Sequence, residues 1–156
     1  FINGSLFSLV SDQRQEAFEN SMRDAGLEIY PELMGHGYYI PETAQYYVSN
    51  FIAAGATAIL CGSDTIANCV FLECQLYGFN VSNDICVVGF DDVKFAAALT
   101  PPLTTVRQEC NDLGRCAYII LNSLIHHIPI SRTQLRPMLI ERESTARVST
   151  AHAAEE

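Results

Sequence analysis

The chain has 156 residues, of which 49% are hydrophobic. This is enough material for one domain with a real apolar core, and it excludes a disordered chain and a small disulfide-stapled scaffold. Nine basic residues against eighteen acidic ones give a net charge of −9. Because such a surface repels phosphate backbones, we expect no binding of DNA or RNA by this chain itself. The apolar runs are too short to cross a bilayer and none resembles a signal peptide, so no membrane contact is expected.

The predicted elements alternate between strand and helix. Helices are expected where apolar residues recur at helical spacing, as after Ser11, the predicted N-cap of the first helix, which Gly26 ends. In chain order we expect a strand end and turn at residues 1–4, a helix at 12–25, a short strand within 27–34, a loop at 35–40, a helix at 41–54, a strand at 57–61, a helix at 65–77, a strand at 85–89, a short helix at 93–99, an extended segment at 103–106, a helix at 109–126 and a strand at 138–140.

This alternation predicts an α/β fold, a doubly wound and mostly parallel sheet with helices on both faces. The strands at 57–61 and 85–89 are wholly apolar, which is typical of strands buried on both faces. Ligands of such folds bind beyond the carboxyl ends of the strands. The turns that matter for function are therefore expected at Gly4–Val10, Gly62–Asp64 and Phe90–Asp92.

The six cysteines form no CxxC pair, and most lie within apolar runs. This is how small buried hydrophobic residues are used in a reducing compartment, so we expect a cytoplasmic protein. The four histidines are not near the cysteines in sequence, which disfavours a zinc site. The sequence predicts no metal and no cofactor.

The expected turns carry none of the common catalytic or phosphate-binding motifs: GxGxxG, the Walker sequence, HExxH and GxSxG are all missing from them. What remains is a set of polar side chains. A guanidinium fork and a carboxylate are suited to a ligand with several hydroxyl groups, and an aromatic ring can pack on the C–H face of a sugar. Each residue also has an ordinary explanation, such as a solvated arginine or a helix cap. The candidates are Arg14, Ser63, Asp64, Asp91, Asp92, Tyr38 and Tyr39.

Several runs of the sequence resemble the effector-binding domain of the lactose-repressor (LacI/GalR) family. The most specific are residues 84–92, DICVVGFDD, and 101–108, PPLTTVRQ. The resemblance is collinear over nearly the whole chain. It also includes TAILCGSD at 57–64, LGR at 113–115, EREST at 141–145, and DQR at 12–14 with Phe18.

The resemblance implies a bacterial transcription regulator that has a helix-turn-helix headpiece and a two-lobed effector domain like a periplasmic sugar-binding protein. It assigns residues 1–106 to the C-terminal lobe, 107–137 to the N-terminal lobe, 138–145 to a strand returning to the C-terminal lobe and 146–156 to a flexible tail. The headpiece is expected to be absent from this chain. Phe1-Ile2 is not a natural start, so we expect an upstream signal or domain to have been removed.

By the same resemblance, Arg14 and Asp91 would contact the effector, with Ser63 where the family often has Asn, and Tyr38 or Tyr39 as the stacking aromatic. The shorter Ser63 side chain puts its role in doubt. A homodimer is implied as well. The alternative is that the apolar residues at the matching positions belong only to the protein core, because every amphipathic helix has such residues. The matching interface positions are Asn68, Phe71, Leu72, Gln75, Phe95, Ala98 and Leu99.

The hypothesis is an effector-sensing part of a regulator, with no enzymatic activity. A sugar or sugar derivative would favour closure of the two lobes, transmitted through Thr105–Gln108 and Leu135–Met138. DNA would be bound only through the missing headpiece, and half a cleft would bind effector weakly. Two alternatives stay open: a periplasmic sugar-binding component of a transporter, and a hydrolase using the adjacent Asp91 and Asp92.

Overall fold

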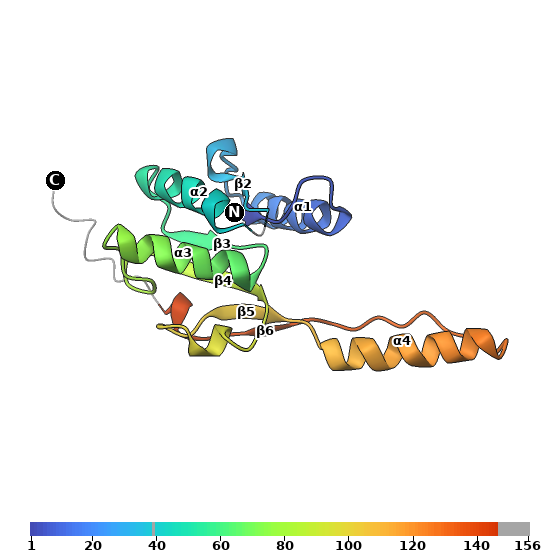
Figure 1. Cartoon of the computed structure of the whole chain (residues 1–156). Helices are drawn as coiled ribbons and strands as arrows, with labels where there is room; N and C mark the ends of the chain where they lie inside the picture. The colour runs from blue at the N-terminus through green and yellow to red at the C-terminus, as the bar shows by residue number, and fades with distance from the viewer. Residues whose placement is uncertain (39, 147–156) are drawn as a thin grey trace.

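The computed structural model describes residues 1–38 and 40–146 as a layered α/β arrangement (Figure 1). One parallel pair consists of β1 (Ile2–Asn3) and β2 (Gly35–His36). A second sheet has the order β3-β4-β5-β6, with β6 antiparallel to β5 and the other neighbours parallel. A bridge between Ile2 and Cys61 joins the two sheets. The bounds in the second sheet are Ala58–Leu60, Cys86–Asp91, Thr104–Arg107 and Met138–Ile140 for β3 to β6.

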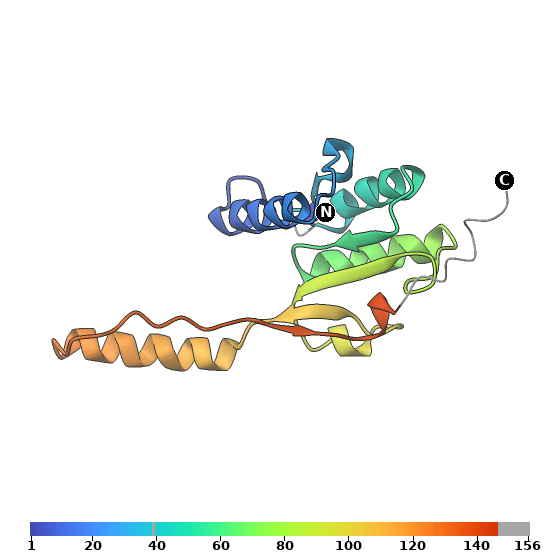
Figure 2. The same cartoon turned by 180° about the vertical axis from the view of Figure 1, so that it is seen from behind.

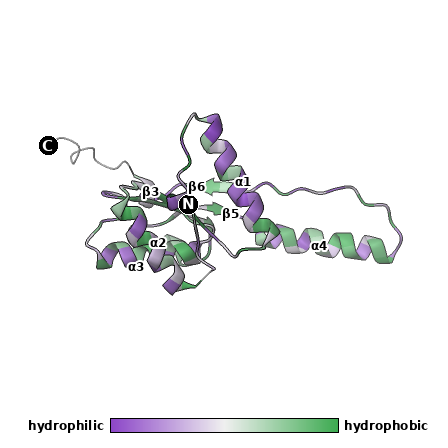
Figure 3. Ribbon diagram, turned by 90° about the horizontal axis from the view of Figure 1, so that it is seen from above, coloured by the Kyte–Doolittle hydropathy of each residue, from purple (hydrophilic) through white to green (hydrophobic). Residues whose placement is uncertain are grey.

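Helices lie on both sides of the strands, as Figure 3 shows from above: α2 and α3 are on one side and α1 is on the other. β1 lies between β2 and β3 in the strand order. The crossovers from β1 to β2 and from β2 to β3 therefore run in opposite directions, and right-handed crossovers then place α1 and α2 on opposite faces. The predicted fold class is confirmed. The helices are α1 (Leu9–Asp24), α2 (Pro41–Ala53), α3 (Asp64–Leu76) and α4 (Cys110–Ile125), with short 3₁₀ turns at Pro31–Leu33, Ala96–Ala98 and Glu143–Thr145.

Two local predictions are wrong. The strand expected within residues 27–34 is a 3₁₀ turn, and the strand lies just beyond it at β2, where Gly35 N donates to Phe1 O at 2.9 Å. Ser11 is not an N-cap, because α1 begins at Leu9 and Ser11 is buried inside it. For β2, pairing with the distant β1 decides the structure.

The core lies mainly between the sheet and the α2–α3 layer. Ile59, Val87 and Gly89 point into it, while their neighbour Ala58 is exposed. The expectation that β3 is buried on both faces is therefore wrong: within the described chain only one face is closely covered. Of the six cysteines, Cys61, Cys69 and Cys74 are buried, whereas Cys110 is exposed. Burial raises the pKa of all three buried thiols, that of Cys74 to about 11.

The helix α4 projects from the rest of the molecule, and the chain returns beside it to β6 (Figures 1 and 2). None of its sixteen residues is buried. The apolar side chains that it leaves exposed are Leu113, Tyr118, Ile119, Leu121, Leu124 and Ile125. We call α4 and the returning residues 126–137 the arm; residues 129–137 form neither helix nor strand.

Replacing Gly89 by alanine is expected to destabilise the chain by about 3 kcal/mol, because the added methyl group overpacks a buried site. A Cβ at this position would collide with the Asp64 carboxylate and lie 2.9 Å from Leu103 Cδ2. Urea unfolding measures the effect. The matched control is Gly114→Ala in α4, where a Cβ meets nothing within 4 Å and is expected to stabilise a helix interior by about 0.5–1 kcal/mol. Equal stability of both variants would contradict this packing.

Candidate functional site

The turns that follow β1 and β3 meet at one edge of the sheet. Gly62 N donates to Ile2 O at 2.7 Å, and a Cβ at Gly62 would lie only 2.9 Å from Gly4 N. A side chain at Gly62 would separate these two backbones, so glycine is required at this close approach. The contact brings the start of α1 beside the start of α3.

Arg14, on α1, is held over this edge by two contacts. Its Nη1 donates to Gly62 O at 2.6 Å, and the carbon at the centre of its guanidinium group lies 3.8 Å from the centroid of the Phe90 ring. The aromatic face attracts the cation, and the carbonyl fixes the orientation of the planar fork. The remaining N–H groups of Arg14 therefore have a defined direction.

Asp91 ends β4 and directly follows Phe90, the residue whose ring Arg14 covers. Its Oδ1 accepts from Gln108 Nε2 at 3.0 Å. Burial raises the pKa of Asp91, and the hydrogen bond from Gln108 and the positive charge of Arg14 only partly oppose this effect. Arg14 is thus near enough to influence the carboxylate.

Arg14 and Asp91 nevertheless do not pair with each other. The ion pairs found among residues 1–38 and 40–146 join other partners, such as Arg107 with Asp92. A guanidinium and a carboxylate that lie near each other without forming an ion pair can both bind a third group. This arrangement suits a ligand that offers hydrogen-bond acceptors to one and hydroxyl donors to the other.

Ser63 and Asp64 are occupied within the fold. Ser63 is buried and its Oγ accepts from Ile66 N at 3.2 Å, as the N-cap of α3. Asp64 is fully buried; its Oδ1 accepts from Thr105 Oγ1 at 2.5 Å and its Oδ2 from Val93 N at 2.9 Å. Both side chains therefore support the edge on which Arg14 and Asp91 lie.

The predicted aromatic partner is not placed beside Arg14. Tyr38 follows β2, is exposed, and has its ring centroid 6.4 Å from that of His36. Tyr39 lies outside the described residues. The ring that contacts Arg14 is Phe90, which the sequence analysis missed as a site residue.

Asp92 has a different environment from its neighbour. Its two oxygens accept from Arg107 Nε at 2.6 Å and from Arg142 Nη2 at 2.7 Å. Burial alone would raise the pKa of Asp92, but the hydrogen bonds from the two arginines outweigh this effect and lower it. Asp91 and Asp92 thus engage separate partners.

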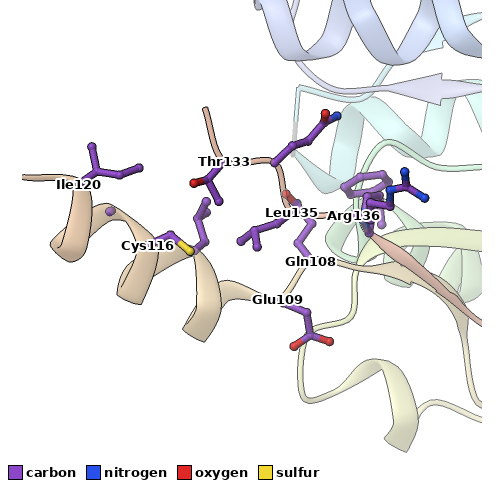
Figure 4. Close-up of a pocket in the computed structure, with 12 residues that line it drawn as sticks. Gln108, Glu109, Cys116, Ile120, Thr133, Leu135 and Arg136 are labelled. Carbon is purple, nitrogen blue, oxygen red and sulfur yellow. The ribbon is translucent and has the colours of Figure 1, made fainter. Parts of the chain in front are cut away.

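A groove of about 420 Å³ lies between α4 and the returning segment of the arm (Figure 4). Phe90 and Gln108 line it, and because they contact Arg14 and Asp91, the groove adjoins the polar site, although Arg14 and Asp91 do not line it. Its volume lies within the usual range of small-molecule pockets. The remaining lining residues are Glu109, Leu113, Cys116, Ala117, Ile120, Thr133, Gln134, Leu135, Arg136 and Pro137.

The residues missed from the sequence are Phe90 and Gln108. Both belong to the runs quoted for the family resemblance, next to Asp91 and Arg107, but nothing in their spacing indicates a shared site. No group of histidine, cysteine and acidic residues within 1–38 and 40–146 is arranged to hold a metal ion. In the same part of the chain, we find no helix with the length and hydropathy needed to span a bilayer.

Comparison with known proteins gives a consistent result. Residues 5–145 match the model of the periplasmic binding protein-like domain. The HTH-type transcriptional repressor PurR of Actinobacillus pleuropneumoniae (serotype 3, strain JL03) is 34% identical over 142 residues, which cover 90% of this chain and 41% of the repressor. The ribose operon repressor of Haemophilus influenzae is 26% identical over 150 residues, 95% of this chain and 44% of that protein.

Solved structures give the same picture. A regulatory protein of the LacI family from Chloroflexus aggregans superposes with a TM-score of 0.85 at 26% identity, covering 92% of this chain and 53% of that one. The chain thus spans less than half the length of the curated relatives that it matches.

Proposed function

Since the chain belongs to the periplasmic binding protein-like family, as an effector-binding domain of the LacI/GalR type, we propose that it senses a small molecule for a bacterial transcription regulator. The effector is a sugar or a sugar derivative, and the regulator acts in the cytoplasm. DNA is bound by a part of the regulator outside this chain. The repressors among its relatives favour this function over a transporter component.

One observation carries the proposal: Arg14 lies over the Phe90 ring and Asp91 is the residue after Phe90, so both lie at the carboxyl end of β4, and they do not pair with each other. Both are half-buried. The fork can donate to adjacent hydroxyl oxygens, and the carboxylate can accept from hydroxyl protons. Phe90, already against Arg14, adds an apolar surface for the C–H face of a sugar ring.

The arm suggests how the second half of the cleft is built. We assign residues 1–106 to one lobe, residues 107–137, which include the arm, to the other lobe, and 138–145 to the return. An amphipathic helix with no buried residue has an apolar face that needs a partner. Effector bound between the lobes would favour their closed arrangement, to the extent that its affinity for that arrangement is greater. The segments Thr105–Gln108 and Leu135–Met138 would transmit the closure.

The experiment is a calorimetric titration of the full-length regulator with D-ribose, D-glucose, D-galactose and cellobiose. We expect at least one of these sugars to bind, and to bind this chain alone much more weakly, because one lobe lacks half of the cleft. If none of them binds the regulator, the effector is not a simple sugar of this kind. If this chain alone binds as tightly as the regulator, the two-lobed site is wrong.

We also propose that the regulator is a homodimer, through the face formed by α3 and the 3₁₀ turn before β5. A groove of about 500 Å³ on this face is lined by Asn68, Phe71, Leu72, Gln75 and Leu99 among others. Leu72 and Phe95 are 53% and 40% exposed, whereas Phe71 belongs to the core. Exposed apolar side chains beside a groove are typical of protein interfaces. Ala98 lies exposed beside Leu99.

Replacing Leu72 by glutamate is expected to convert the dimer into monomers, because a charge buried between subunits has no partner. Sedimentation velocity of the full-length regulator measures this change. Tyr46→Glu, on the exposed surface of α2, is the control and should leave the dimer intact. A Leu72→Glu variant that still sediments as a dimer would rule out this face.

A further inference from the structure

Asp92 joins the turn that carries Asp91 to the two strands that connect with the arm. Arg107 is the last residue of β5, shortly before the chain enters the arm, and Arg142 follows β6 at the end of that strand away from the arm. One carboxylate accepts from both guanidinium groups, at 2.6 and 2.7 Å. We propose that Asp92 is a positioning residue that couples the orientation of Asp91 to β5 and to the segment that follows β6.

The turn itself is held in an unusual conformation. Asp91 and Asp92 have φ of 117° and 55°, in the region that side-chain-bearing residues rarely adopt. Two buried groups fix it: Asp64 accepts from Val93 N at 2.9 Å, and Thr105 Oγ1 accepts from Asp92 N at 3.4 Å. Such a turn has little freedom, so Asp91 cannot reorient without moving Asp92.

The Asp92 carboxylate and Arg142 are largely shielded from water, whereas Arg107 is partly exposed. The Asp92 side chain is 8% exposed and that of Arg142 is 16% exposed, while Arg107 is 39% exposed. Arg142 also donates from Nη1 to Leu103 O at 2.7 Å, which anchors it to the segment before β5. Charge-assisted hydrogen bonds in such surroundings are stronger than those at an open surface. Asp92 therefore links β4, β5 and β6 at the edge of the sheet where the effector is proposed to bind.

A consequence for regulation follows, and it rests on the proposed function of Asp91. An effector that binds Asp91 favours one conformation of the turn. Through its two ion pairs, Asp92 extends this preference to the positions of Arg107 and Arg142. The end of β5 and the segment that follows β6 then respond together, because a single carboxylate pairs with both. The strands β5 and β6 carry the chain into the arm and back from it, so this preference reaches the connection between the lobes.

The test is a double-mutant cycle of Asp91→Asn and Asp92→Asn, read by hydrogen–deuterium exchange of the whole chain. Asp92→Asn should raise amide exchange about tenfold in β5 and β6, because it removes two charged hydrogen bonds. Exchange in β3 should not change. Asp91→Asn should alter exchange in β5 and β6 when Asp92 is present and have no such effect when Asp92 is asparagine.

The control is Asp112→Asn, which removes a carboxylate that pairs with Arg115 on the exposed surface of α4; it should leave β5 and β6 as in the wild type. Any of three results would overturn the coupling. They are unchanged exchange in β5 and β6 of Asp92→Asn, an equal rise of exchange in β3, and additive effects in the cycle. If the cycle behaves as expected and no sugar binds the regulator, the proposed function fails while the coupling stands.

Discussion

Arg14→Ala in the full-length regulator is expected to weaken binding of the sugar found by titration by about 3 kcal/mol, roughly a hundredfold, because charged hydrogen bonds to the ligand are lost. The same loss should abolish the response of the regulator to that sugar. Arg14 is already oriented by Gly62 O and by the Phe90 ring, so its fork is available to the ligand without rearrangement. Asp91→Ala is expected to have an effect of the same size.

Two variants of α1 make this measurement specific. Arg14→Lys keeps the charge but loses the planar fork, so we expect an intermediate loss of affinity. Arg23→Ala removes an arginine that pairs only with the same helix, through Glu19 and Asn20, and should bind as the wild type does. Thermal unfolding checks that each variant is folded. Normal sugar affinity in a folded Arg14→Ala variant would remove Arg14 from the site.

Asp64→Ala is expected to destabilise the chain by about 3 kcal/mol or more, because it leaves buried hydrogen-bonding groups without partners. Asp64 is fully buried and accepts from Thr105 Oγ1 and Val93 N. Its loss would also free the Asp91–Asp92 turn, which depends on the same contacts. Urea unfolding gives the change in free energy.

The Asp64→Asn variant separates the two roles of this side chain. Asparagine keeps the shape and one acceptor oxygen but presents its amide hydrogens to another donor, so we expect a loss of about 1–2 kcal/mol. Asp24→Ala, at the exposed end of α1, is the control and should change the stability by less than about 0.5 kcal/mol. If Asp64→Ala is no less stable than Asp24→Ala, the buried network does not contribute as described.

The longer elements were predictable because their signals are local. The helices α2, α3 and α4 fall within two residues of their expected bounds, each set by apolar periodicity and by a clear stop, such as Gly55 and Gly78 with φ of 78°. The region from Leu27 to His36 was mispredicted. There the strand is defined by pairing with β1, a partner more than thirty residues away, and not by its own two residues.

The site was predictable only in part for a similar reason. Family resemblance indicated Arg14 and Asp91, and the structure places both at one edge of the sheet. It could not indicate that Phe90 lies under Arg14, or that Asp92 bonds to Arg142 fifty positions later in the chain. Such contacts arise from the crossing of segments distant in sequence, for which local patterns carry no signal.

The uneven burial of the thiols has a practical consequence. Cys61, Cys69 and Cys74 are buried, and burial raises the pKa of their thiols. Cys110 is exposed and is the first residue of α4. Because the thiolate is the reactive form, maleimides and similar reagents should modify Cys110 well before these three. Once the half-buried Cys86 and Cys116 are replaced by serine, a fluorophore attached to Cys110 would report directly on movement of the arm.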